Sequence, residues 1–313
     1  MSDLDVAGVA SGISVVVPVY NSAELLSVLH ERVTAALADH DFELVLVNDG
    51  SVDGSWRQIC ALAASDPRVR GVDLARNYGQ HNALLAGVRA ASRELIVTID
   101  DDLQNAPEDI PKLLARLADG FDVVYGTSRG AYEGLARALG TRLTKFALRI
   151  AIGGDVARNV SAFRAFRTQI RDAFADFSAP YVSLDALLSW GTSRFAAVPV
   201  AVSPRGRGRS GYTLGRLATH ALNVLTGFTT RPLRWASALG LAFTLVGAGL
   251  LAYVLIRYVI GGTLPGFTFL ASAISLFAGV QLLTLGVAGE YLARMHDRVI
   301  NRPPYAIRDK VGG

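Results

Sequence analysis

The stretch Leu-Ile-Val-Thr-Ile-Asp-Asp-Asp-Leu-Gln, residues 95–104, runs from an apolar segment directly into three consecutive carboxylates. An apolar, β-branched run of this length is typical of a buried strand in a parallel sheet. Adjacent carboxylates repel one another unless a cation lies among them. Because open α/β sheets bind ligands at the carboxyl ends of their strands, we expect a divalent metal and a phosphorylated ligand here. An acidic loop that caps a helix beginning near Pro107 is the alternative.

Strand and helix patterns alternate on both sides of this segment. Strands are predicted at 13–17, 43–47, 69–74 and 123–125, and helices at 22–39, 56–64, 82–91 and 107–117. This alternation predicts an α/β fold with a mostly parallel sheet and right-handed crossovers.

Polar residues follow the other predicted strands as well. Pro-Val-Tyr-Asn at 18–21, Asn-Asp at 48–49 and Arg-Asn at 76–77 each stand where a strand ends. Together with the acidic cluster they outline a nucleotide-binding crevice at one edge of the sheet. The first strand is not followed by Gly-x-Gly-x-x-Gly, and no Walker lysine occurs, which argues against a dinucleotide cofactor and a P-loop ATPase.

The chain beyond residue 234 has the composition of a membrane segment. The whole chain of 313 residues is 51% hydrophobic, with a mean hydropathy of +0.32. No charged residue occurs at 235–256 or at 258–289, and a Gly-Gly-Thr-Leu-Pro-Gly turn interrupts the second run. A bilayer is crossed by about 20 apolar residues, so spans are predicted at about 235–256 and 267–289. Two buried core helices of a soluble domain are the alternative.

Arginine placement predicts the topology of this hairpin. Arg231 and Arg234 precede the first span, and only Arg257 lies in the connection. The basic residues after the second span are Arg294, Arg298, Arg302, Arg308 and Lys310. By the positive-inside rule, both ends of the chain are expected in the cytoplasm. The absence of a signal-peptide pattern at 1–12 and the single Cys60 agree with a cytoplasmic catalytic part. With a net charge of +4 and no aromatic–basic motif, nucleic acid is not an expected partner.

Six motifs, in order, resemble those of the inverting family 2 glycosyltransferases of the GT-A fold, and more narrowly the polyprenyl-phosphate glycosyltransferases. They are Val-Pro-Val-Tyr-Asn at 17–21, Asn-Asp-Gly-Ser-Val-Asp-Gly-Ser at 48–55, Arg-Asn-Tyr-Gly-Gln-His-Asn-Ala-Leu at 76–84, Asp-Asp-Asp-Leu-Gln-Asn-Ala-Pro-Glu at 100–108, Gly-Thr-Ser-Arg at 126–129, and Gly-Glu-Tyr-Leu-Ala-Arg at 289–294 before Arg302-Pro303. The resemblance implies metal-dependent transfer of a sugar from a nucleoside diphosphate (UDP or GDP) to a polyprenyl phosphate, undecaprenyl or dolichyl. Mg²⁺ or Mn²⁺ is the implied cofactor, and the cytoplasmic (inner) membrane is the implied location.

The resemblance also implies roles for residues at the sheet edge. Pro18 and Tyr20 would pack on the nucleobase, Asp49 would hydrogen-bond it, and Arg76 would approach the nucleotide. The residues implied to bind the nucleotide are Pro18, Tyr20, Asn21, Asp49, Arg76, Asp100 and Asp101. Those implied to hold the metal are Asp100, Asp102 and Gln104, and those implied to act in catalysis are Asp100, Asp102 and Arg129.

Arginines are the expected ligands of the acceptor phosphate, because their planar fork matches phosphate oxygens. The candidates are Arg129, Arg137, Arg142, Arg205, Arg207 and Arg209. For the tract at 205–209, attraction to lipid headgroups is the alternative. A phosphate monoester has a second pKa of roughly 6 and is mostly an anion at neutral pH, so a general base is dispensable. Some relatives have an acid where this chain has Ala162, which leaves the question of a base, or of compensation by Asp155, open.

The predicted organisation is a cytoplasmic GT-A domain at 1–212, a juxtamembrane amphipathic helix at 213–233, the membrane hairpin at 234–291 and a cytoplasmic tail at 292–313. The alternatives are a processive, or protein- or lipid-directed, family 2 glycosyltransferase and an inactive nucleotide-binding scaffold. The chain lacks Gln-x-x-Arg-Trp and has too few spans for a translocation pore, and its acidic motif is intact. A homo-oligomer remains open.

Overall fold

The computed structural model describes residues 12–127, 159–201, 226–260 and 266–312. Its strands form one sheet of eight, in the order β7-β5-β6-β4-β1-β2-β3-β8. The strands are β1 (Ile13–Val19), β2 (Phe42–Asn48), β3 (Val69–Leu74), β4 (Leu95–Thr98), β5 (Val123–Thr127), β6 (Arg164–Arg167), β7 (Phe195–Pro199) and β8 (Ile307–Val311). The helices of this part are α1 (Leu26–Ala36), α2 (Ser55–Ser65), α3 (Gln80–Ala90), α4 (Ile110–Ala118) and α7 (Leu184–Gly191), with 3-10 helices η1 (Pro107–Asp109) and η2 (Thr168–Phe174).

The central strands run parallel, which confirms the predicted α/β fold class. β1 pairs in parallel with β2 and β4, β2 pairs in parallel with β3, and β5 with β7. β6 is antiparallel to β4 and β5, and β8 is antiparallel to β3. The ends of β1, β2, β3 and β4 therefore meet at one edge, because parallel strands carry their carboxyl ends on the same side.

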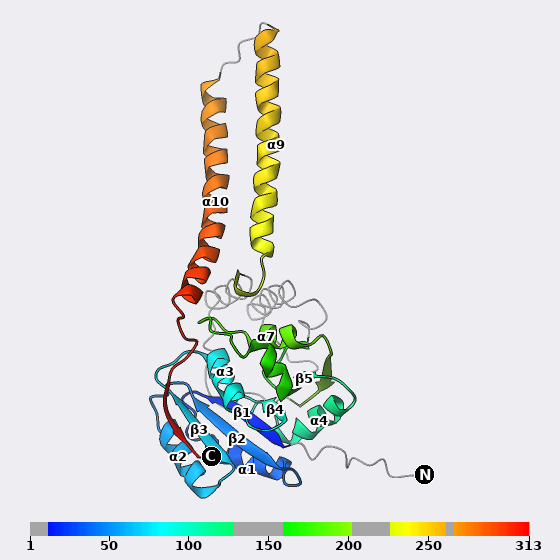
Figure 1. Ribbon diagram of the computed structural model, residues 1–313, viewed down its shortest axis with the longest axis vertical. Coiled ribbons are helices and arrows are strands. Elements are labelled where there is room, and N and C mark those ends of the chain that lie inside the picture. Colours follow the sequence, from blue (N-terminus) through cyan, green and yellow to red (C-terminus); the bar gives the residue numbers. More distant parts are fainter. Residues whose placement is uncertain (1–11, 128–158, 202–225, 261–265, 313) are drawn as a thin grey trace, which may run out of the picture.

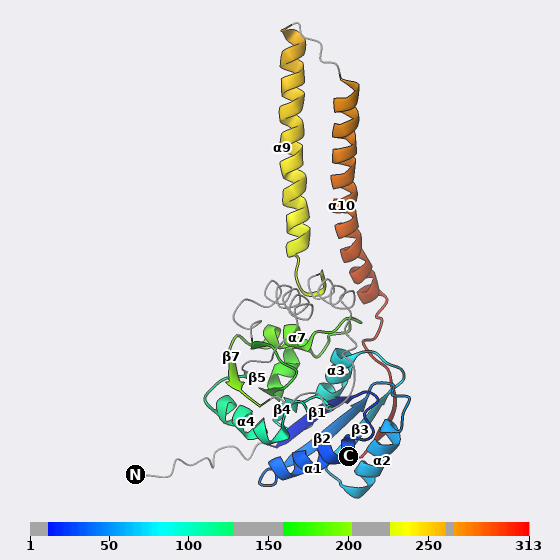
Figure 2. The same cartoon turned by 180° about the vertical axis from the view of Figure 1, so that it is seen from behind.

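Helices cover both faces of the sheet, and alternate residues of each strand supply the two cores. Val15 and Val17 of β1 pack in a cluster with apolar residues of α1, α2 and α4, while Val16 packs with α3, η2 and α7. Gly87 lets α3 approach the sheet closely, since a Cβ there would lie 2.3 Å from Val16 Cγ1 and 2.9 Å from Val47 Cγ2. In both views α3 and α7 lie on the side of the sheet nearer the long helices (Figures 1 and 2).

Two long helices, α9 (Arg231–Val259) and α10 (Phe267–Val299), project side by side from this domain (Figure 1). Both are long and apolar enough to cross a membrane, and none of the most apolar 18-residue stretch of either is buried. The ring of Phe243 in α9 packs against the ring of Phe277 in α10, with the ring centroids 6.0 Å apart. This exposure disfavours the alternative of two core helices. Each helix also extends beyond its predicted span, 235–256 or 267–289, because charged residues at the ends continue the helix without being apolar.

The chain returns to the sheet after α10. β8 pairs with β3, and Ala75 N–H donates to the Ala306 carbonyl at 2.9 Å. Arg308 reaches Asp73 Oδ2 at 3.5 Å and the Ala75 carbonyl at 2.5 Å. The segment predicted as a tail at 292–313 is therefore fixed at one end by α10 and at the other by the sheet. Residues 213–225 of the juxtamembrane helix expected at 213–233 lie outside the described residues.

Candidate active site

A cleft with a volume of about 200 Å³ lies at the carboxyl edge of the parallel strands, and we call it the acidic cleft. Its lining residues are Pro18, Val19, Tyr20, Asp49, Asn77, Gly79, Gln80, Asp100, Asp101 and Asp102. They come from the ends of β1, β2 and β4 and from the connection between β3 and α3. Four of the lining side chains are carboxylates, and no arginine or lysine of the described residues is among them. The structure thus brings together most of the polar clusters that the sequence placed at strand ends.

Asp101 links the acidic motif to the loop after β1 through hydrogen bonds. Its Oδ2 accepts hydrogen bonds from the Tyr20 N–H, at 3.0 Å, and from the Ser22 hydroxyl. Partial burial, together with the neighbouring charge of Asp102, raises the pKa of the Asp101 carboxyl. Because this carboxylate is engaged with the protein backbone, we infer that it shapes the cleft around the exposed ring of Tyr20.

Asp49 joins the loops that follow β2 and β3. Its two carboxylate oxygens accept the Tyr78 N–H at 2.7 Å and the Gly79 N–H at 2.9 Å. The side chain is buried, and burial raises the pKa of the Asp49 carboxyl. Gly50 adopts φ +66°, and a Cβ there would lie 2.4 Å from Asn77 N, so the tight approach of the two loops requires glycine. Each oxygen of Asp49 retains a second lone pair for a base edge.

Asp100 is oriented by a residue that the sequence did not single out. Gln80, the first residue of α3, donates from Nε2 to Asp100 Oδ1 at 2.7 Å. Gln80 stands in the quoted motif at 76–84, which was the available signal. Asp102 Oδ1 accepts the Gln104 N–H at 3.1 Å across Leu103, which has φ 57°. The Gln104 side chain is not among the described residues that line the cleft.

The donor set of the cleft fits a hard divalent cation. All four acidic side chains offer oxygen ligands, which suit Mg²⁺ or Mn²⁺. Asp49 and Asp101 each accept two hydrogen bonds from the surrounding loops, so Asp100 and Asp102 remain the candidate ligands. Among the described residues, no group of three or more His, Cys, Asp or Glu side chains is arranged to hold an ion by itself. This fits a magnesium-type site that the oxygens of a bound diphosphate complete.

Two predicted nucleotide ligands lie beside the cleft instead of lining it. Asn21 has φ 54°, and its Oδ1 accepts the Val52 N–H at 2.9 Å, which joins the loops after β1 and β2. Arg76 lines a neighbouring hollow, where its guanidinium carbon lies 4.5 Å from the centroid of the Tyr78 ring. Asp53 accepts the Ser55 N–H at 2.9 Å at the start of α2, as expected for a residue that supports this helix.

A buried ion pair lies at β6, the strand beside β4, and was not predicted. Arg164 donates from Nη1 to Asp185 Oδ1, and the Tyr125 hydroxyl donates to the same oxygen at 3.0 Å. The Arg164 and Asp185 side chains are only 2% and 4% exposed. Burial raises the pKa of the Tyr125 hydroxyl well above its usual value. Ala162 lies nearby, and its carbonyl accepts the Thr98 hydroxyl at 2.7 Å.

The predicted acceptor arginines cannot be placed. Arg129, Arg137, Arg142, Arg205, Arg207 and Arg209 lie outside the described residues, as does Asp155. Their roles stay predictions.

Comparisons with known proteins agree with this architecture. Residues 14–174 match the sequence profile of glycosyl transferase family 2. The undecaprenyl-phosphate 4-deoxy-4-formamido-L-arabinose transferases of Yersinia pestis (strain Pestoides F) and Yersinia enterocolitica are each 35% identical to this chain over 308 residues, which cover 96% of this chain and 94% of each relative. Glucosyl-3-phosphoglycerate synthase from Mycobacterium tuberculosis, solved with Mn²⁺, UDP and phosphoglyceric acid, superposes with a TM-score of 0.52 at 21% identity, over 70% of this chain and 77% of that one. At that identity the likeness shows the fold alone.

Proposed function

The chain belongs to glycosyl transferase family 2, and on that premise we propose that it transfers a sugar from a nucleoside diphosphate to a polyprenyl phosphate at a membrane surface. The observation that carries the proposal is the acidic cleft at the strand ends of a GT-A sheet, in a chain that also holds two membrane-length helices. The relatives named above act, by name, on undecaprenyl phosphate, and they match the chain over nearly its whole length.

The donor would bind in the acidic cleft. Pro18 and Tyr20 offer flat apolar surface to a nucleobase, and Asp49 offers carboxylate oxygens to its edge. Asp100 and Asp102 are the proposed ligands of Mg²⁺ or Mn²⁺, which would stabilise the negative charge that develops on the leaving diphosphate. Gln104, the third ligand implied by the sequence, would have to turn its side chain into the cleft. The solved neighbour with Mn²⁺ and UDP supports a divalent metal and a uridine nucleotide.

The reaction is a single displacement. An oxygen of the acceptor phosphate attacks the anomeric carbon, the bond from that carbon to the diphosphate oxygen breaks, and the nucleoside diphosphate leaves with the electron pair. The configuration at the anomeric carbon inverts. Because the nucleophile is already an anion, no proton has to be removed, which is compatible with Ala162 at the position discussed above. Arg129 and the other predicted arginines would hold the acceptor phosphate against the repulsion of the diphosphate.

The membrane arrangement supports access to a lipid substrate. Since β8 lies in the same sheet as β1, the domain before α9 and the segment after α10 are on one side of any membrane that the hairpin crosses. The arginine excess on that side favours the cytoplasm.

Labelled donors test the proposal directly. Membranes that contain the protein are incubated with polyprenyl phosphate and a panel of labelled UDP- and GDP-sugars, among them UDP-4-deoxy-4-formamido-L-arabinose. We expect label in the organic phase for one donor, dependent on Mg²⁺ or Mn²⁺, and none when polyprenol replaces polyprenyl phosphate. Labelled polymer in place of labelled lipid would indicate a processive synthase and contradict the proposal.

A further inference from the structure

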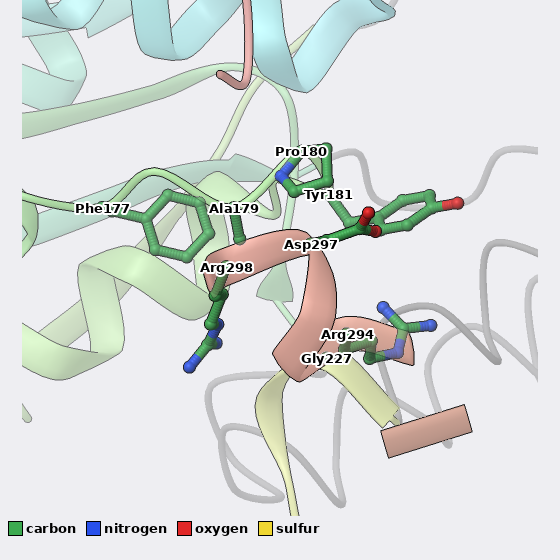
Figure 3. A pocket seen from close by; sticks show the side chains of 8 residues that line it. All are labelled: Phe177, Ala179, Pro180, Tyr181, Gly227, Arg294, Asp297 and Arg298. Carbon is green, nitrogen blue, oxygen red and sulfur yellow. The ribbon is translucent and has the colours of Figure 1, made fainter. Parts of the chain in front are cut away.

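A second hollow, of about 160 Å³, adjoins the acidic cleft, and we call it the arginine hollow. Asn77 lines both. Pro180 and Tyr181 line the arginine hollow and also a third, smaller hollow at the foot of α10, shown in Figure 3. The three hollows therefore form a row from the foot of the hairpin to the carboxylates. Asn82 of α3 holds the wall between them in place, since its Nδ2 donates to the Pro180 carbonyl at 3.1 Å.

The arginine hollow has the opposite charge from the cleft beside it. Arg76 and Arg302 line it, and no aspartate or glutamate of the described residues does. Within the described residues, the carboxylate nearest to Arg302 is that of Asp297, whose Oδ1 lies 3.9 Å from Arg302 Nη1, which is too long for a hydrogen bond. The Arg302 side chain is 54% exposed, so its guanidinium is accessible to a ligand.

Backbone contacts before and after Arg302 hold this residue in place. Its N–H donates to the Asp297 carbonyl at 3.2 Å at the end of α10, after Asn301 with φ 50°. Pro303 and the buried Pro304 follow and restrict the backbone. Beyond them the segment is bonded to β3 through Ala306 and β8. A position held this firmly suits a binding residue better than a solvated tail.

Arginines continue from this hollow toward the hairpin at intervals of four residues. Arg294 and Arg298 line the hollow at the foot of α10. Figure 3 shows Arg294 on the side of Tyr181 and Arg298 pointing to the other side. The guanidinium carbon of Arg294 lies 5.1 Å from the centroid of the Tyr181 ring. The negative end of the α10 dipole lies here and favours cations. Arginines thus extend from the foot of the hairpin to the edge of the acidic cleft, while Asp297 also lines the hollow at the foot of α10 and Arg294 pairs with Glu290.

We infer that the arginine hollow holds the phosphate monoester of the lipid acceptor before transfer, with Arg302 as its principal ligand there, and that Arg129 and the other predicted arginines hold it during transfer. This inference rests on the proposed function. A polyprenyl phosphate carries its charge at the end of an apolar chain, so its phosphate reaches the protein at the membrane surface. A hollow lined by arginines, and by no acid of the described residues, lies between that surface and the carboxylates and matches this group in charge and hydrogen-bond geometry. The donor diphosphate has the acidic cleft and its cation, so the two anions are held apart until they react.

Replacement of Arg302 tests the inference against a matched control. Arg302→Gln is compared with Arg57→Gln, which removes the same charge from an exposed position on α2 that lines none of the three hollows. In nanodiscs, Arg302→Gln should raise the apparent KM for polyprenyl phosphate roughly 10- to 100-fold, as expected for loss of a charged hydrogen bond. Nucleotide affinity with Mn²⁺ and the melting temperature should not change. Arg302→Lys should restore acceptor use in part, because an ammonium keeps the charge and lacks the fork.

Two results would overturn the inference while sugar transfer itself stands. One is an unchanged acceptor KM in Arg302→Gln. The other is an equal loss of donor and acceptor affinity, which would place Arg302 on the nucleotide. If the wild-type protein transfers no sugar, the proposed function fails, and binding of polyprenyl phosphate against polyprenol in nanodiscs then tests the hollow. Loss of the phosphate preference in Arg302→Gln supports the site. A preference unchanged in the variant, or a change only in the response to phosphatidylglycerol, overturns it.

Discussion

The acidic cleft and the arginine hollow share a wall at Asn77 and carry opposite charge. In the cleft, loops bring four carboxylates together, and backbone N–H groups hold two of them, Asp49 and Asp101. In the hollow, Arg302 is positioned by a proline-rich segment between α10 and β8. Like charges gathered in this way destabilise a protein without a ligand. The difference therefore supports the proposal of two anionic substrates, one bound through a cation and the other by guanidinium groups.

The buried pair of Arg164 and Asp185 is a useful contrast to both sites. Its two charges compensate each other inside the protein, and the Tyr125 hydroxyl donates a further hydrogen bond to the Asp185 carboxylate. Such a pair joins β6, β5 and α7 and needs no ligand. The cleft and the hollow are instead charged surfaces that a substrate would neutralise.

The largest effect is expected from Asp102→Asn, which removes a charge from the acidic cleft without a change in volume. Transfer should fall by roughly 1,000-fold or more, because the proposed cation stabilises charge on the leaving group. Calorimetry should show that Mn²⁺-dependent nucleotide affinity is lost in parallel. Asp119→Asn is the control, since it also removes one carboxylate charge, from an exposed ion pair with Arg116. Transfer by Asp102→Asn at a near wild-type rate would mean that the metal site is elsewhere.

Disruption of the buried pair of Arg164 and Asp185 should lower the stability of the protein and leave its substrate affinity unchanged. Asp185→Asn leaves the Arg164 charge buried and uncompensated, which typically costs about 3–5 kcal/mol. Urea unfolding in detergent should show this loss, while the nucleotide KM of the remaining folded protein should stay close to that of the wild type. A change in KM without a loss of stability would place Asp185 in the substrate site.

Ser22→Ala should have a smaller effect, confined to the cleft. The Ser22 hydroxyl donates to Asp101, which in turn holds the Tyr20 backbone against the cleft. A hydrogen bond to a charged group contributes about 1.5–3 kcal/mol, and part of it is retained by the Tyr20 N–H. We expect the donor KM to rise roughly 5- to 20-fold with little change in kcat. Ser65→Ala, at an exposed hydroxyl on α2, should leave both constants unchanged. Equal effects of the two variants would contradict the role of Asp101.

Local pattern was sufficient to predict strands β1 to β5 and the acidic cleft, whereas β6 and β7 were not predicted. Strands β1 to β4 are short apolar runs, and polar residues stand where each one ends, so parallel pairing alone brings Tyr20, Asp49 and Asp100 together. The strand β8 was not predicted, because Ile-Arg-Asp-Lys-Val alternates no apolar face and stands at an exposed sheet edge. Its position depends on pairing with β3, far away in the sequence.

The contacts that orient side chains were also beyond the sequence. Gln80 meets Asp100 only because α3 begins at the edge where β4 ends. Arg164 and Asp185 are found together only when β6 and α7 pack on β5. Arg302 was counted as a basic residue for topology, and its place beside Asn77 follows from the return of the chain to the sheet. In each case residue type was informative, and the partner was set by tertiary packing.

The smallest effect is expected in the pH dependence of stability, where a cleft carboxyl and a structural one should behave oppositely. Burial raises the pKa of Asp101, while hydrogen bonds from Arg194 hold the pKa of Asp122 below its usual value. The folded protein therefore binds a proton at Asp101 more tightly than the unfolded chain, and at Asp122 less tightly. Ionised Asp101 costs stability above its raised pKa, and this cost disappears as the pH falls through that pKa. The contribution of Asp122 is present above its unfolded pKa and is lost as the pH falls through the depressed one.

In metal-free buffer at pH 7, Asp101→Asn should raise the stability of the protein and Asp122→Asn should lower it, each by about 1 kcal/mol or less. Both differences should shrink in unfolding curves measured toward pH 3. Stabilisation by Asp101→Asn should also vanish when Mn²⁺ and UDP are added, because the bound cation compensates the carboxylates. A destabilised Asp101→Asn at pH 7 would show that Asp101 acts, like Asp122, as a satisfied structural carboxylate.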